Sequence, residues 1–176
     1  MKLITAMLLL FCALNVAVAA DEPEIDRLVD VLMRRLQTGK DVACWKRLKN
    51  LEISDAAREK EVIEAMKNQA AAAGLKDMAY VESVARSQIE ANKMLQKSYF
   101  DRWKGNEFRK GCTLNLEDIR QKLNTLGTEM VTALIAAHPK TVGMSCKNAL
   151  EAYSIKHKTE LDAGAVAMAL SEICRP

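Results

Sequence analysis

The chain has 176 residues, enough for one domain that buries a core of its own. Its 26 basic and 23 acidic residues are intermixed, and the net charge of +3 is too small and too evenly spread to favour binding to nucleic acid or an anionic membrane. Helix-favouring residues dominate, and no segment alternates apolar and polar residues as a strand would. We therefore predict an all-α fold, a single-domain bundle of about six helices.

Residues 1–20 have the pattern of a cleaved export signal. Lys2 supplies a positive start, residues 3–18 are almost wholly apolar, and Ala17-Val18-Ala19 is a small-x-small cleavage site. The segment is short for a membrane anchor and lacks a basic flank. We expect the mature domain, residues 21–176, to be periplasmic or secreted and free of the membrane.

The first predicted helix, from about Asp26 to Leu48, is long and carries two cations on its apolar face. Spacings of three and four residues keep seven side chains on that face: Ile25, Leu28, Leu32, Arg35, Gly39, Val42 and Lys46. A buried cation without a partner is costly, so a fold keeps one only where an anion meets it. Arg35 and Lys46 therefore predict an inward-facing anion, either a carboxylate of the protein or a ligand.

A second helix, with Ser54 as its N-cap and an end near Gly74, brings more charges to the same core. Its apolar stripe consists of Val62, Met66, Ala70 and Ala73. Extending that stripe backward by one turn reaches Arg58 and Glu59, and a further turn reaches Asp55. These three side chains should border the core.

The third predicted helix, from about Asp77 to Trp103, has amides on an otherwise apolar face. That face contains Val81, Ala85, Gln88, Asn92, Gln96, Tyr99 and Trp103. A single buried amide or inward cation has an ordinary structural explanation, such as a satisfied core hydrogen bond or a snorkelling side chain. Three helices with donors directed to one interior together favour a pocket for a small polyanion.

The last third of the chain predicts three more helices. After an irregular stretch from Lys104 to Leu114, a helix with Asn115 as its N-cap should end before Pro139. Two shorter helices, at about residues 145–158 and 162–174, would form a C-terminal hairpin.

Four cysteines remain once the signal, which contains Cys12, is removed: Cys44, Cys112, Cys146 and Cys174. In an oxidising compartment they can pair in three ways. Cys146 and Cys174 lie near the two ends of the predicted hairpin, where a disulfide would clamp the last helix, so we favour that pair. The other two either form a second disulfide or remain small buried thiols.

A metal site is disfavoured. The sequence has no C-x-x-C motif, and neither His138 nor His157 is close to a cysteine along the chain. We expect each histidine at the surface or at a helix end.

The order and spacing of these residues resemble the all-helical AroQ-type chorismate mutases. The matching positions are Asp26-Arg27-Leu28, Arg35-Leu36, Val42-Ala43 with Lys46, Ile53 with Asp55, Arg58-Glu59, and Gln88-Ile89-Glu90-Ala91-Asn92-Lys93 with Gln96 and Trp103. The export signal, the added C-terminal helices and the segment from Asn115 to Leu126 with Arg120 resemble the exported gamma subclass. The resemblance covers nearly the whole mature chain.

The resemblance implies a unimolecular rearrangement of chorismate to prephenate, which needs no metal or organic cofactor. The substrate carries two carboxylates, and guanidinium groups suit planar carboxylates. By resemblance, these carboxylates are bound by Arg35, Arg58 and Arg120.

Five further positions receive roles by the same resemblance. Lys46 and Gln96 would contact the ether oxygen of the substrate, and Glu59 its ring hydroxyl. Asp55 and Asn92 would give supporting contacts. Family members often have Ser or Thr in place of Asn92 and can have Glu in place of Gln96.

The resemblance also implies a homodimer with a complete site in each chain. Two other functions remain open from the sequence. One is a secreted helical interaction protein that kept this fold without catalysis, and the other is a carrier for a different small dianion.

Overall fold

Helices make up most of what the structure describes. This computed structural model describes residues 22–103, 105, 107–113, 115–157 and 159–176, so the predicted export signal lies outside the described residues. The helices are α1 (Pro23–Gln37), α2 (Gly39–Leu48), α3 (Ala56–Ala72), α4 (Met78–Arg102), η1 (Glu107–Gly111), α5 (Leu116–Ala137), η2 (His138–Lys140), α6 (Gly143–Lys156) and α7 (Ala163–Leu170). The predicted all-α class is confirmed. In the described ranges, no helix is both long enough and apolar enough to cross a membrane.

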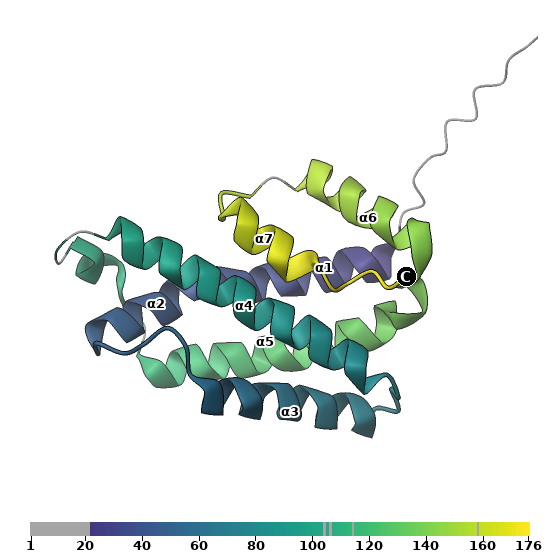
Figure 1. The fold of residues 1–176 in the computed structure, drawn as a ribbon, viewed down its shortest axis with the longest axis horizontal. Helices are drawn as coiled ribbons and strands as arrows, with labels where there is room; N and C mark the ends of the chain where they lie inside the picture. Colours follow the sequence, from purple (N-terminus) through teal and green to yellow (C-terminus); the bar gives the residue numbers. More distant parts are fainter. Residues whose placement is uncertain (1–21, 104, 106, 114, 158) are drawn as a thin grey trace, which may run out of the picture.

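The core lies where α1 meets α4, α5 and α7. Figure 1 shows α3 along one side of α4 and α5, with α6 and α7 covering the opposite side of the bundle. The predicted apolar face of α1 is fully buried, because Ile25, Leu28 and Leu32 are each 0% exposed. Full burial of one such side chain contributes about 1.5–3 kcal/mol, so this helix anchors the fold.

The first predicted helix is divided at Thr38, so the prediction of one continuous helix was wrong at that point. The hydroxyl of Thr38 donates a hydrogen bond to the Arg35 carbonyl oxygen over 2.7 Å, and its backbone N–H donates to the same oxygen over 3.2 Å. These two hydrogen bonds to the Arg35 carbonyl oxygen replace one turn of the regular α-helical hydrogen bonds. The Val42 N–H still reaches the Thr38 carbonyl, so Arg35 and Lys46 remain on one continuous face.

Side-chain caps fix where α3, α4, α5 and α7 begin. Asn115 accepts a hydrogen bond from the Asp118 N–H over 3.0 Å, which confirms the predicted cap of α5. The predicted cap of α3 was wrong by one residue, because Asp55, not Ser54, accepts from the Arg58 N–H. A carboxylate is favoured there by the positive end of the helix dipole.

The C-terminal hairpin differs from its predicted bounds. The helix α6 begins two residues earlier, at Gly143, and α7 ends at Leu170 instead of Cys174. The chain must leave the helix there because Arg175 exchanges backbone hydrogen bonds with Thr141 and Gly143.

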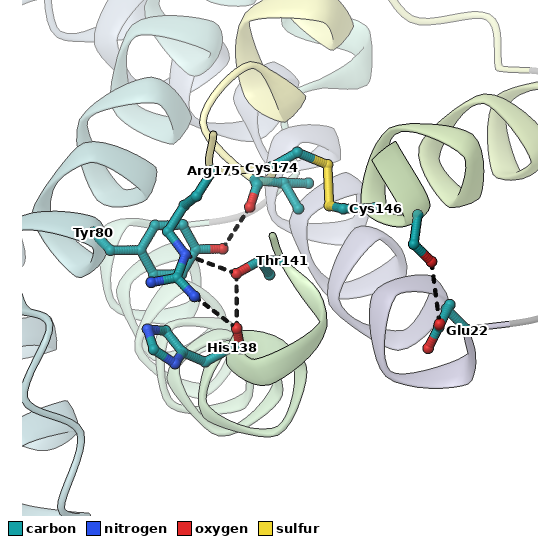
Figure 2. The surroundings of a disulfide bond; sticks show 9 residues. Glu22, Tyr80, His138, Thr141, Cys146, Cys174 and Arg175 are labelled. Atoms are coloured by element: carbon teal, nitrogen blue, oxygen red, sulfur yellow. Dashed lines mark hydrogen bonds between the residues drawn. A yellow bond between two sulfur atoms is a disulfide. The ribbon is translucent and has the colours of Figure 1, made fainter. Parts of the chain in front are cut away.

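Both disulfides are present. The predicted pair of Cys146 and Cys174 is confirmed, and Figure 2 shows it joining α6 to the last residues of the chain. The alternative left open for the other two cysteines is resolved, because Cys44 of α2 is bonded to Cys112, which directly follows η1.

A network around Arg175 fastens the C-terminus beside the disulfide between Cys146 and Cys174. Its guanidinium donates to the Asp77 carboxylate over 2.9 Å, to the Thr141 hydroxyl over 3.0 Å and to the His138 carbonyl over 2.9 Å. The same guanidinium lies over the ring of Tyr80, 5.0 Å from the ring centroid. Figure 2 shows these two side chains next to each other. His138 lies at the end of α5, as predicted, and His157 lies at the end of α6.

Gly39 allows α2 to approach α4 closely. A Cβ atom at this buried position would lie 3.0 Å from Leu95 Cδ2 and 3.2 Å from Asn92 Nδ2. Both neighbours are themselves buried, so they have little room to move.

We expect Gly39→Ala to destabilise the protein by about 1–3 kcal/mol, because the added methyl group overpacks the contact between α2 and α4. Gly127→Ala is the matched control, since its Cβ would meet Met66 Cε at an ordinary 3.6 Å in the interior of α5. The control should be neutral or more stable by up to about 1 kcal/mol. Urea unfolding measures both, and equal stabilities of the two variants would contradict the close packing at Gly39.

Candidate active site

A cavity of about 460 Å³ lies between α2, α3, α4 and α5, with the end of α1 at its wall. All eight residues that the sequence singled out for binding line this one cavity: Arg35, Lys46, Asp55, Arg58, Glu59, Asn92, Gln96 and Arg120. They come from five helices and the cap of α3. The fold therefore gathers the predicted set in a single chain.

Arg35 is the most buried cation of the cavity. The residue is only 7% exposed, and its Nε has no hydrogen-bond partner among the described residues. Burial, and then repulsion by Arg58, lowers the pKa of Arg35 to about 10, so the group is still charged at neutral pH. No carboxylate of the described chain pairs with it. An anion from outside the protein would remove the cost of this burial.

Lys46 is half-buried and held by the backbone. Its Nζ donates a hydrogen bond to the carbonyl oxygen of Ile53, in the loop before α3. Burial lowers the pKa of Lys46, while the nearby carboxylates of Asp55 and Glu59 act in the opposite direction. The ammonium is thus fixed in place and partly stripped of water.

The first turn of α3 forms a braced rim. Asp55 accepts from the Arg58 N–H, and Glu59 accepts from the Asp55 N–H over 3.1 Å, which resembles a capping box displaced by one residue. The other oxygen of Glu59 lies 3.4 Å from the Lys93 ammonium. The Arg58 guanidinium pairs with Glu61 over 3.0 Å, but both groups are largely exposed, so this ion pair is weak.

Two amides of α4 leave hydrogen-bonding capacity unused. Gln96 Nε2 donates to Asn92 Oδ1 over 2.7 Å, and both residues are buried. Asn92 Nδ2 and Gln96 Oε1 have no partner in the described part of the chain. Because an amide NH₂ carries two hydrogens, Gln96 Nε2 also keeps one donor for another acceptor.

The cavity carries a net positive charge. Its cations are Arg35, Lys46, Arg58, Lys93 and Arg120, and its carboxylates are Asp55, Glu59 and Glu61. Five positive and three negative groups leave an excess of two positive charges. Arg120 is exposed on the second turn of α5 and forms no ion pair with the described residues. A cavity with this charge suits a small dianion.

The sequence assigned no role to two charged groups of the cavity, and it placed the amide of Gln88 wrongly. Lys93 and Glu61 received no role, although Lys93 is three residues before Gln96 and so shares its helix face. Gln88 was expected to face the polar interior with Asn92 and Gln96. It lies outside the cavity and donates instead to the Ala169 carbonyl of α7 over 3.1 Å.

Two sequence comparisons both match this chain to chorismate mutases. A family profile described as "Chorismate mutase type II" matches residues 24–97. A secreted chorismate mutase from Mycolicibacterium smegmatis is 32% identical over 136 residues, which cover 77% of this chain and 75% of that protein.

Solved structures agree at the level of the fold. The crystal structure of a chorismate mutase from Burkholderia thailandensis has a TM-score of 0.76 and 27% identity, covering 87% of this chain and 100% of that one. A secreted chorismate mutase from Yersinia pestis, 23% identical, has a TM-score of 0.66 over 84% of this chain and 94% of that one.

We expect Arg35→Met to raise the free energy of unfolding by about 1–2 kcal/mol, because an apolar chain of similar length replaces a buried, unpaired cation. Urea unfolding at pH 7 without added polyanions measures this change. Arg120→Met, at an exposed position of the same cavity, is the control and should change stability by less than about 0.5 kcal/mol. A clear loss of stability in Arg35→Met would mean that Arg35 has a structural role.

Proposed function

The chain belongs to the type II chorismate mutase family, and from this membership we propose how its cavity binds chorismate and converts it to prephenate. In this intramolecular reaction the ether C–O bond breaks as a new C–C bond forms. No nucleophile takes part, so the protein must hold the substrate in its compact conformer and stabilise the negative charge that develops on the ether oxygen.

One observation carries the proposal: the buried, unpaired guanidinium of Arg35 in a cavity with an excess of two positive charges. Chorismate is a dianion of matching charge. We assign its two carboxylates to Arg35, Arg58 and Arg120. Arg58 can exchange its weak, exposed contact with Glu61 for a substrate carboxylate at little cost.

Lys46 and Gln96 are assigned to the ether oxygen. The ammonium of Lys46 is steadied by the Ile53 carbonyl, and Gln96 has a free N–H that its bond to Asn92 orients. Donors fixed before the reaction stabilise developing charge without having to reorganise. Asn92 thus supports Gln96.

Glu59 is assigned to the ring hydroxyl of the substrate, since its carboxylate can accept a hydrogen bond at the rim of the cavity. Asp55 supports this contact, because its backbone N–H holds Glu59 and its own side chain caps α3.

The protein is exported, and its two disulfides suit an oxidising compartment. We propose a homodimer in which each chain has a complete site. The single chain already supplies the whole set of proposed binding residues, so the chemistry does not depend on a residue from a partner.

A chorismate-consumption assay on the purified protein tests the function directly. Family membership favours catalysis over a non-catalytic interaction protein. A carrier for another dianion would bind chorismate weakly or not at all and would leave it unchanged.

We expect Arg35→Ala and Lys46→Ala each to lower kcat/KM by about 10²- to 10³-fold. Loss of a donor to a developing oxyanion, as proposed for Lys46, costs about 2.7–4 kcal/mol in comparable enzymes, and loss of one partner of a buried charge pair, as proposed for Arg35 and a carboxylate, costs about 2–5 kcal/mol. Steady-state kinetics at pH 7 measures the loss, and circular dichroism checks that each variant is folded. Near-normal turnover by either folded variant would show that its residue does not contact the substrate.

A separate prediction concerns pH. Gln96 donates from a neutral amide, so kcat of the natural protein should stay nearly constant between about pH 5 and pH 8, where no proposed contact residue has its ordinary pKa. In Gln96→Glu the carboxyl donates only when protonated. Burial raises its pKa, whereas Lys46 and Arg35 lower it. Activity of this variant should therefore fall as pH rises through that pKa.

The measurement is kcat against pH for both proteins, each checked for folding at every pH. Lys97→Glu, on the exposed face of α4, is a matched control that introduces the same carboxyl away from the cavity. It should keep the flat profile of the natural protein. A flat profile for folded Gln96→Glu would mean that residue 96 does not contact the ether oxygen.

A further inference from the structure

The segment that carries Arg120 has little packing of its own. Of the first nine residues of α5, only Ile119 is buried, whereas the rest of the helix buries a continuous apolar face from Leu126 to Ala137. Leu116 and Leu123 are only partly buried and line the cavity. A segment with few buried apolar contacts opens at low free-energy cost unless something else holds it.

A disulfide ties this segment to α2, the helix that brings Lys46 to the cavity. Cys44 is 4% exposed in α2, two residues before Lys46. Its partner Cys112 lies between η1 and α5, eight residues before Arg120. The two ends of this bridge therefore lead directly to two groups that we assign to the substrate.

The other contact between the start of α5 and α2 is weaker, and a separate ring contact holds η1. Lys122 of α5 faces Asp41 of α2 over 3.4 Å, but the lysine side chain is 52% exposed, and such pairs contribute little. The ring of Phe108 in η1 stacks on that of Trp103, with 5.4 Å between the ring centroids, and Phe108 is only 8% exposed. This contact holds η1 against the end of α4.

We propose that the Cys44–Cys112 disulfide is a positioning element of the active site. It holds the start of α5 so that Arg120 faces Lys46 and Arg35 across the cavity, and its loss weakens substrate binding through Arg120. The inference rests on the proposed role of Arg120. It also implies that a reducing environment lowers affinity for chorismate.

The second disulfide is an internal control. The bridge between Cys146 and Cys174 joins α6 to the chain end, and the cavity is lined by no residue of α6 or of the chain end. Both bridges should stabilise the fold by closing a loop, but only the first should affect the substrate.

The test compares Cys44→Ala/Cys112→Ala with Cys146→Ala/Cys174→Ala, each assayed well below its melting temperature. For the first variant we expect KM to rise about tenfold while kcat changes by less than about threefold, because the contacts to the ether oxygen are kept. The second should melt at a lower temperature with KM within about twofold of the natural value. Equal KM values for the two folded variants would overturn the proposal.

A double-mutant cycle with Arg120→Ala tests the role of the bridge separately from the role of Arg120. If the bridge acts through Arg120, its removal from Arg120→Ala should change KM by less than about twofold. If removal of the bridge raised KM tenfold in Arg120→Ala as well as in the natural protein, the bridge would act elsewhere. An unchanged KM in Arg120→Ala alone would instead refute the proposed role of Arg120.

A second variant covers the case in which Cys44→Ala/Cys112→Ala does not fold. Phe108→Leu loosens the same connection by removing the stack on Trp103 while both disulfides stay intact. It should raise KM by about threefold, and less than twofold in the Arg120→Ala background. A KM equal to that of the natural protein would count against positioning by this segment.

Discussion

The burial of one unpaired guanidinium is the constraint on which the rest of the structure depends. Arg35 continues the apolar face of α1, so its charge lies at the edge of the core and not in solvent. Within the described residues no carboxylate neutralises it, and its pKa is lowered by burial. Such a group is costly to the empty protein, and its cost is removed only by an anion in the cavity.

The opposite end of the bundle compensates for this cost. There, the apolar face of α1 is buried, a disulfide joins α6 to the chain end, and Arg175 satisfies its donors with three different residues. Stability and binding are therefore separated in space: one end is apolar and well paired, and the other holds groups with unused hydrogen-bonding capacity. This division is expected of proteins that trade stability for a binding site.

The site is also braced before any substrate arrives. Asp55 and Glu59 hold each other at the start of α3, the Ile53 carbonyl holds Lys46, and Asn92 holds Gln96. In a unimolecular rearrangement, rate depends on the conformer that is held and on fixed donors, because no group of the enzyme forms a bond to the substrate. Preformed contacts of this kind are what the reaction requires of the protein.

The sequence by itself determined which faces of the helices are polar, because side chains three and four residues apart lie together whatever the tertiary fold. That periodicity was sufficient to place Arg35, Lys46 and Gln96 inside, and the cysteine count with the resulting hairpin was sufficient to pair Cys146 with Cys174. Only the tertiary structure decided which neighbour each face meets. Gln88 shares its stripe with Gln96 yet bonds to α7, and Cys44 found its partner 68 residues away, because contacts between distant segments leave no local pattern.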